Sequence, residues 1–262
     1  MLIQNRRDFL TNATVFDALA ATGIARGAFD EVGKSLKIKI GAFAATLVAA
    51  GVVLAGDLAL PEGYKRLEWI ESTGSQYIDT GVDAGTNTTI DMSFGHSVYG
   101  NGRTLFGKDV WDPQGFLFIL QNGKFRFFGA KGKEPGEAWN LVEKDETEER
   151  DYRFTLGADN KARLFGADGR ELCALATDRS TASHHTLWLF KCDSPYSALG
   201  EFRLYAMKIG TDAGETLRDF VPARRMNDKA VGLYDRVTKR FFANDGTGAF
   251  LAPGDPSPQN KR

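Results

Sequence analysis

The chain has 262 residues, of which 42% are hydrophobic and 26% are charged, and its formal net charge is −1. This length allows one large β domain or two small domains with a substantial core. A net charge so close to zero argues against a nucleic-acid binder that works by neutralising phosphates, so we expect no nucleic-acid partner. The 19 Phe and 29 Gly favour strands joined by turns.

Residues 34–59 form an apolar segment with a basic start. Three lysines precede an uncharged apolar run over residues 40–56, which Asp57 ends. This order is typical of a secretory signal, and an apolar helix of about 17 residues also suffices for an uncleaved anchor. A buried core helix is the third interpretation, which the lack of an amphipathic face disfavours. We expect a signal peptide or membrane anchor here, with membrane contact only through residues 40–56.

Residues 1–33 form an N-terminal extension. Its NRRDFL stretch, residues 5–10, looks like a twin-arginine export motif, although Asp17 and Arg26 follow and the apolar run begins late. A cytoplasmic stretch before a membrane segment and a wrongly chosen upstream start codon are the alternatives. By the positive-inside rule, residues from about 60 onward lie outside the cytoplasm. The protein is therefore expected to be secreted or anchored at the cell surface or in the periplasm.

Residues 60–252 are expected to form the folded domain, and residues 253–262 a disordered Pro-rich tail. Strand patterns recur about every ten residues, and Asn122-Gly123 is a strong hairpin signal. No helical pattern of three turns appears after residue 60, so consecutive hairpins predict an all-β, two-sheet antiparallel sandwich of jelly-roll type. Trp69 and Trp188 follow the strand alternation and are expected to face the core. The expected strands are Thr88–Phe94, Phe116–Leu120, Lys124–Phe128, Tyr152–Leu156, Ala162–Phe165, Leu172–Leu175, Thr186–Phe190, Phe202–Ile209, Val231–Tyr234 and Arg240–Phe242.

Both ends of this domain carry a family resemblance. The opening LPEGYKRLEWIESTGSQYIDTGV (60–82) and the closing FRLYAMKIG (202–210) and LRDFVPARRMNDKAVGLYDRVTKRFFANDGTGAF (217–250) resemble bacterial and phage surface domains. Those domains have the concanavalin A-like lectin/glucanase (laminin-G-like) jelly-roll fold. The resemblance implies this fold and a surface location. It also implies carbohydrate or protein partners, which related modules sometimes bind through calcium.

The sharpest catalytic pattern is Glu143, Asp145 and Glu148. Its E-x-D-x-x-E spacing is found in retaining glucanases of the same fold, where two carboxylates about 5 Å apart act as nucleophile and acid/base. A catalytic strand carries apolar residues at the alternate positions, but Lys144 and Glu146 stand there. The charged run continues beyond them and is typical of a solvated loop. We therefore expect no catalytic residues, with these three as weak candidates.

A binding site needs aromatics with polar neighbours. Tyr99, Trp111 and Trp139 lie in or beside Gly- and Asp-rich connections and are the candidate ligand-binding residues. Asp109 and Asp112 are weak calcium candidates, because calcium prefers oxygen donors. The alternative is that these are ordinary loop residues whose Trp rings cap the core. No cofactor is expected, and calcium dependence stays open.

The chain has two cysteines, Cys173 and Cys192, and no CxxC spacing, which argues against a zinc site. In an exported protein they form a single disulfide or remain two buried free thiols. His184 and His185 are adjacent, and adjacent strand residues point to opposite faces, so they do not share a ligand set. His96 stands alone.

These patterns favour an exported, non-catalytic binding module for carbohydrate or a cell-surface partner, either a glycan or a surface protein. The alternatives are a glycoside hydrolase that uses Glu143, Asp145 and Glu148, and a structural or adhesion protein of a virion or cell surface. The ligand and the oligomeric state are not readable from the sequence.

Overall fold

The computed structural model describes residues 59–95, 103–107, 117–121, 124–128, 138–140, 151–177, 186–192 and 200–255. The chain divides into two compact units, Met1–Pro61 and Glu62–Arg262, and every described strand belongs to the second. The described residues include no helix with the length and apolar character that crossing a membrane requires. The predicted signal or anchor run over residues 40–56 lies outside them, as does most of the Pro-rich tail.

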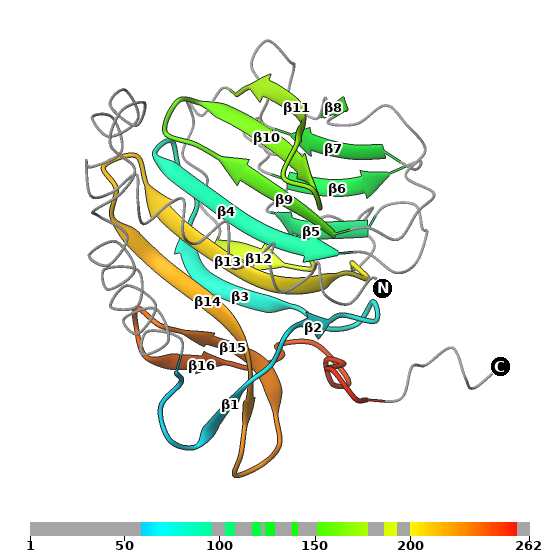
Figure 1. Cartoon of the computed structure of the whole chain (residues 1–262), viewed down its shortest axis with the longest axis vertical. Helices are drawn as coiled ribbons and strands as arrows, with labels where there is room; N and C mark the ends of the chain where they lie inside the picture. Colours follow the sequence, from blue (N-terminus) through cyan, green and yellow to red (C-terminus); the bar gives the residue numbers. More distant parts are fainter. Residues whose placement is uncertain are drawn as a thin grey trace, which may run out of the picture. The chain divides into compact units, whose positions relative to one another are not determined.

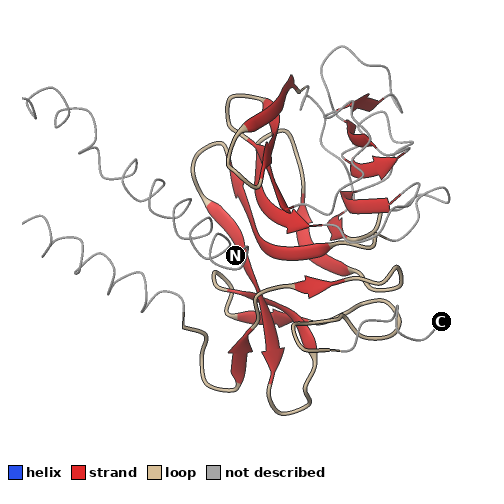
Figure 2. Ribbon diagram, turned by 45° about the vertical axis from the view of Figure 1, so that its right-hand side comes forward, coloured by secondary structure: helices blue, strands red, loops and turns tan. Residues whose placement is uncertain are grey.

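The second unit is a sandwich of two antiparallel sheets, as predicted, and Figures 1 and 2 show its strands. The larger sheet has ten strands: β11 (Glu171–Ala176), β10 (Lys161–Gly166), β9 (Asp151–Leu156), β4 (Thr88–Gly95), β13 (Arg203–Thr211), β14 (Thr216–Arg225), β15 (Val231–Asp235) and β16 (Arg240–Phe242) in spatial order, with β1 (Tyr64–Arg66) on β14 and β2 (Ile70–Glu71) on β13. The smaller sheet has six: β3 (Ile78–Asp83), β12 (Thr186–Leu189), β5 (Arg103–Gly107), β6 (Leu117–Gln121), β7 (Lys124–Phe128) and β8 (Ala138–Asn140).

The core lies between the two sheets and is rich in Phe. Phe154 of the larger sheet stacks on Phe118 of the smaller sheet, with ring centroids 4.5 Å apart, and contacts Phe106 at 5.4 Å. Phe94 meets the Phe118 ring edge-on at 5.6 Å. All four side chains are at most 1% exposed. Alternate residues of each strand supply these rings, which explains why period-two patterns predicted the strands.

The long strand β14 was not predicted, because Pro222 stands in its middle and a proline normally excludes an interior strand position. Arg225 donates its N–H to the Ala230 carbonyl across the β14–β15 hairpin at 2.9 Å. In an antiparallel pair every second residue bonds to the partner strand, so Ala223 and Val221 also face β15. The N and C=O of Pro222, which lies between them, therefore point away from β15. On that other side the Pro222 carbonyl accepts the Leu67 N–H, at the gap between β13 and β1. The N–H that Pro222 lacks would therefore point towards Leu67, so the proline removes no bond between β14 and β15.

The opening turn is closed by the C-terminal loop. The Gln76 Oε1 accepts the Thr73 N–H at 2.7 Å, which fixes the turn between β2 and β3. The Thr247 N–H then donates to the Ser75 carbonyl, and the Ser75 hydroxyl donates to the Thr247 carbonyl. The two ends of the domain are therefore joined by backbone bonds, and this contact holds the start of β3 in place.

Candidate functional site

One cluster of aromatic and charged side chains lies on the outer face of the smaller sheet. In β12, Leu187 and Leu189 are at most 1% exposed, so Trp188 between them points away from the core. The Tyr77 ring, just before β3, lies with its centroid 5.6 Å from that of Trp188 at an interplanar angle of 44°. The expectation that Trp188 faces the core is wrong, because the leucines occupy the inward positions. Trp69 is also partly exposed.

Lys191 completes this cluster. Its Nζ lies 4.2 Å from the centroid of the Tyr77 ring and 4.5 Å from that of Trp188, both within range of a cation–π contact. We call Tyr77, Trp188 and Lys191 the aromatic platform. The Trp188 Nε1 is buried and has no hydrogen-bond partner among the described residues. Buried donors of this kind are normally paired, but this one lies beneath the surface, out of reach of a ligand on the platform.

A backbone outlier at Phe190 puts Lys191 on this face. Phe190 has φ 64°, a left-handed conformation that bulky residues rarely adopt and that costs roughly 1–3 kcal/mol. Strict alternation would turn Phe190 outward and Lys191 inward. Instead Leu189 and Phe190 are both buried, and Lys191 points outward over Trp188. The Phe190 N–H donates to the Leu105 carbonyl at 2.7 Å, which helps to hold the bend.

Two carboxylates border the platform. Asp79 pairs with Trp188 across β3 and β12, and its Oδ1 accepts the Gly81 N–H at 2.8 Å. The Asp245 Oδ2 accepts the Asp79 N–H at 2.9 Å, and the Asp245 N–H donates to the Tyr77 carbonyl at 2.9 Å. Asp245 therefore supports β3 from the C-terminal loop. An aromatic surface with an ammonium and two carboxylates suits a ligand that combines an apolar face with hydroxyl groups.

The largest part of the sequence-predicted site lies outside the described residues. This applies to Tyr99, Asp109, Trp111 and Asp112, and to the acidic residues Glu143, Asp145 and Glu148. Trp139 belongs to β8, where its backbone pairs with Phe127 of β7. Among the described residues no three His, Cys, Asp or Glu side chains gather as metal ligands would.

The two cysteines do not form a disulfide in the structure. Cys173 is half-buried against the main core on β11, whereas Cys192 is buried beside Leu117 and Ile119 in a separate small cluster. Burial, with a smaller contribution from the Glu171 charge, raises the pKa of the Cys173 thiol. Cys173 is therefore protonated and weakly nucleophilic near neutral pH.

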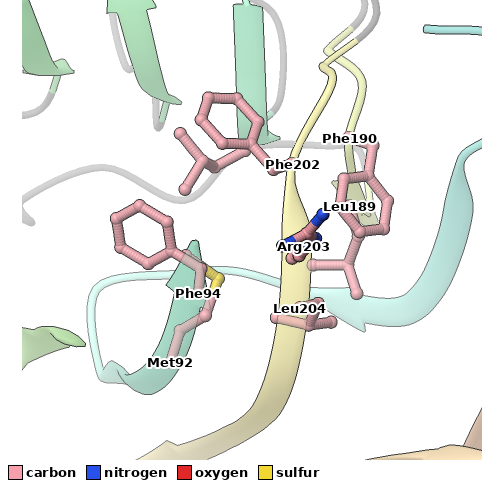
Figure 3. Close-up of a pocket in the computed structure, with 8 residues that line it drawn as sticks. Met92, Phe94, Leu189, Phe190, Phe202, Arg203 and Leu204 are labelled. Atoms are coloured by element: carbon pink, nitrogen blue, oxygen red, sulfur yellow. The ribbon is translucent and has the colours of Figure 1, made fainter. Parts of the chain in front are cut away.

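A small cavity inside the sandwich is not a ligand site. It measures about 10 Å³ and is lined mainly by apolar side chains, among them Met92, Phe94 and Phe202 (Figure 3). A space of that size holds about one water molecule. Arg203 reaches its edge, where its Nε donates to Glu71 at 2.6 Å and its guanidinium lies 4.7 Å from the centroid of the Trp69 ring. The cavity is therefore a packing gap.

Comparisons with known proteins assign no family. No family model and no curated protein matches the chain. The CBM40 module of the Ruminococcus gnavus IT-sialidase, bound to alpha2,3 sialyllactose, is 14% identical with a TM-score of 0.36, over 54% of this chain and 90% of that one. Domains LG4-5 of the mouse laminin alpha1 chain are 13% identical with a TM-score of 0.36, over 60% of this chain and 44% of that one.

The full extracellular region of zebrafish Gpr126/Adgrg6 is 9% identical with a TM-score of 0.39. The match covers 72% of this chain and 26% of that one. This chain thus spans less than half of the laminin and zebrafish chains. Likeness at this level transfers no ligand to this chain.

Proposed function

We propose that the β-sandwich is a non-catalytic binding module of the concanavalin A-like jelly-roll type. Its partner is a carbohydrate or a cell-surface molecule, and the aromatic platform is its contact surface. The observation that carries the proposal is the bend at Phe190, where an unfavourable φ turns Lys191 out over Trp188 and Tyr77. Strain of this kind concentrates at functional sites.

The chemistry of the platform supports a sugar or a sugar-like ligand. A pyranose has one apolar face that stacks on an aromatic ring, while its hydroxyls need donors and acceptors at the rim. The Lys191 ammonium supplies donors over the two rings, and Asp79, which pairs with Trp188 across β3 and β12, supplies an acceptor. The proposal includes an extracellular location, for which the apolar run over residues 40–56 is the support.

A glycan array probed with the full-length chain tests the proposal, with sialylated and neutral glycans present and with and without EDTA. We expect glycan binding by the wild type and a loss of up to about tenfold in Trp188→Ala, since one stacking contact is worth up to roughly 1.5 kcal/mol. Trp69→Ala is the matched control, because Trp69 is also partly exposed beneath a cation, Arg203. It should bind like the wild type.

Three outcomes would overturn parts of the proposal. A wild-type chain that binds neither glycans nor intact cells contradicts a binding module. Equal losses in Trp188→Ala and Trp69→Ala contradict the platform as its site. Release of reducing sugar from a bound glycan, abolished in Glu143→Gln, assigns a glycoside hydrolase instead. Loss of binding in EDTA that added calcium restores would show that calcium takes part.

A further inference from the structure

The strand β11 forms one edge of the ten-stranded sheet and, within the described residues, pairs only with β10. Open edges are normally blunted by charges, prolines, bulges or covering groups, because they invite pairing with another strand. At the edge of the smaller sheet, β3 is covered in this way, since Asp245 accepts its Asp79 N–H and Arg218 donates to its Thr80 carbonyl.

On β11 only the first half is protected. The register with β10 shifts between Leu164 and Phe165, so Leu172 lies in a bulge beside Glu171. Bulges twist an edge away from incoming strands. The second half, CALAT over residues 173–177, has no charge, no proline and no register shift.

The hydrogen-bond phase shows which groups of this second half are open. Thr177 donates its N–H to the Asn160 carbonyl at 2.8 Å, and the same register continues through Leu175 and Cys173. In an antiparallel ladder the residues between them direct their N–H and C=O groups to the other side. These are Ala174 and Ala176, whose side chains are both exposed.

We propose that two copies of the chain pair antiparallel through residues 173–177 of β11, about a two-fold axis at Leu175. This register sets Ala174 opposite Ala176 of the second copy twice, and each such pair exchanges two hydrogen bonds. Leu175 meets its own counterpart as a non-hydrogen-bonded pair, where side chains approach most closely. The ten-stranded sheet then continues from one copy into the next.

A second copy fits this edge because the segment is complementary to itself. No charged residue stands opposite another, and small alanines let the two backbones approach on the outer face. Leu175 packs against the core while still partly exposed, so pairing extends the apolar core across the axis. The proposal does not rest on the proposed function, although a dimer would present two aromatic platforms.

A cysteine cross-link tests the register in the full-length chain. Leu175→Cys in a Cys173→Ser background should form a covalent dimer on mild oxidation, because directly opposed cysteines fall within about 4.4–6.8 Å between Cα atoms. The native chain is the matched control, since the register sets Cys173 opposite Thr177 of the partner copy. Cross-linking of native Cys173 as efficient as that of Leu175→Cys, or none in either, would overturn the pairing.

A second pair of variants tests the hydrogen bonds. Ala174→Pro removes an N–H that points away from β10, so no bond within the chain is lost and the fold should stay intact. The dimer dissociation constant, measured by analytical sedimentation, should rise about tenfold or more. Ala167→Pro is the control in the same hairpin. The Gly169 N–H donates to the Gly166 carbonyl and closes a β-turn in which Ala167 is the second residue. Proline is favoured at that position, so this variant should leave the dimer unchanged. A wild type that stays monomeric at about 100 μM, or a dimer equally stable in both variants, would refute the proposal.

Discussion

Asp235 offers the sharpest test of how the C-terminal part of the sheet is held together. Its side chain is fully buried at the end of β15 and accepts hydrogen bonds from the Asp219 N–H at 2.8 Å and the Thr238 hydroxyl at 2.6 Å. It also accepts the Val237 N–H at 3.1 Å, and the Arg218 Nε lies 3.7 Å away. One carboxylate therefore joins β14, the β15–β16 turn and a half-buried cation.

The substitution Asp235→Ala removes all of these acceptors at once. A buried donor left unpaired costs about 1–3 kcal/mol, and breaking one partner of a buried ion pair costs about 3–5 kcal/mol. Water can reach the turn residues and replace part of the lost hydrogen bonding, so the two costs do not add in full. We expect a total loss of about 3–5 kcal/mol in the free energy of unfolding. For a domain of this size that lowers the melting temperature by roughly 6–20 °C, measurable by circular dichroism.

Asp228 supplies the matched control for this test. It occupies the neighbouring β14–β15 hairpin and accepts the Ala230 N–H, two residues on, just as Asp235 accepts the Val237 N–H. It also pairs with Arg225, but it is exposed to solvent. Asp228→Ala should leave the melting temperature almost unchanged, because exposed ion pairs contribute little. If both substitutions lowered the melting temperature equally, burial would not be what makes the Asp235 contacts valuable, and the reasoning would be refuted.

Three further predictions test the core, a close approach and a thiol. Phe118→Ala should cost about 3–5 kcal/mol in denaturant unfolding, because the ring lies at the centre of the aromatic core. Gly200→Ala should destabilise by about 1–3 kcal/mol or more in the same assay, since its Cβ would lie 1.8 Å from the Thr104 carbonyl oxygen. For Cys173 the raised pKa leaves less thiolate, so at pH 9 iodoacetamide should modify it more slowly in the native chain than in urea, as mass spectrometry would show. Equal rates would contradict its burial.

The sandwich was predictable because its strands have one buried face. The period-two alternation of Thr88–Phe94 predicts such a strand, and Ile90, Met92 and Phe94 are all buried in β4. Residues 117–121 and 124–128 pair as a hairpin, in agreement with the turn signal between them. The strand β14 was missed because Pro222 stands within it, on the side where the paired residues of β13 and β1 leave a gap. That gap is a tertiary feature with no local pattern.

The aromatic platform was missed for two physical reasons. In TLWLF, Thr186 and Trp188 alternate with Leu187 and Leu189, and the sequence alone does not state which pair faces inward. The choice depends on the opposing sheet, which buries the leucines. Tyr77 reaches Trp188 only because β3 pairs with β12, a long-range contact that local periodicity does not encode.

The bend at Phe190 couples this surface to the interior. The same φ that turns Lys191 outward turns the Phe190 ring inward, where its centroid lies 5.5 Å from that of Phe250. A substitution at Phe190 therefore removes core packing and the stacked ammonium together, whereas Lys191→Met removes only the charge. If the platform binds a ligand, Lys191→Met should change affinity at unchanged melting temperature, and Phe190→Ala should lower both. This difference separates a strained residue that shapes a site from one that only fills the core.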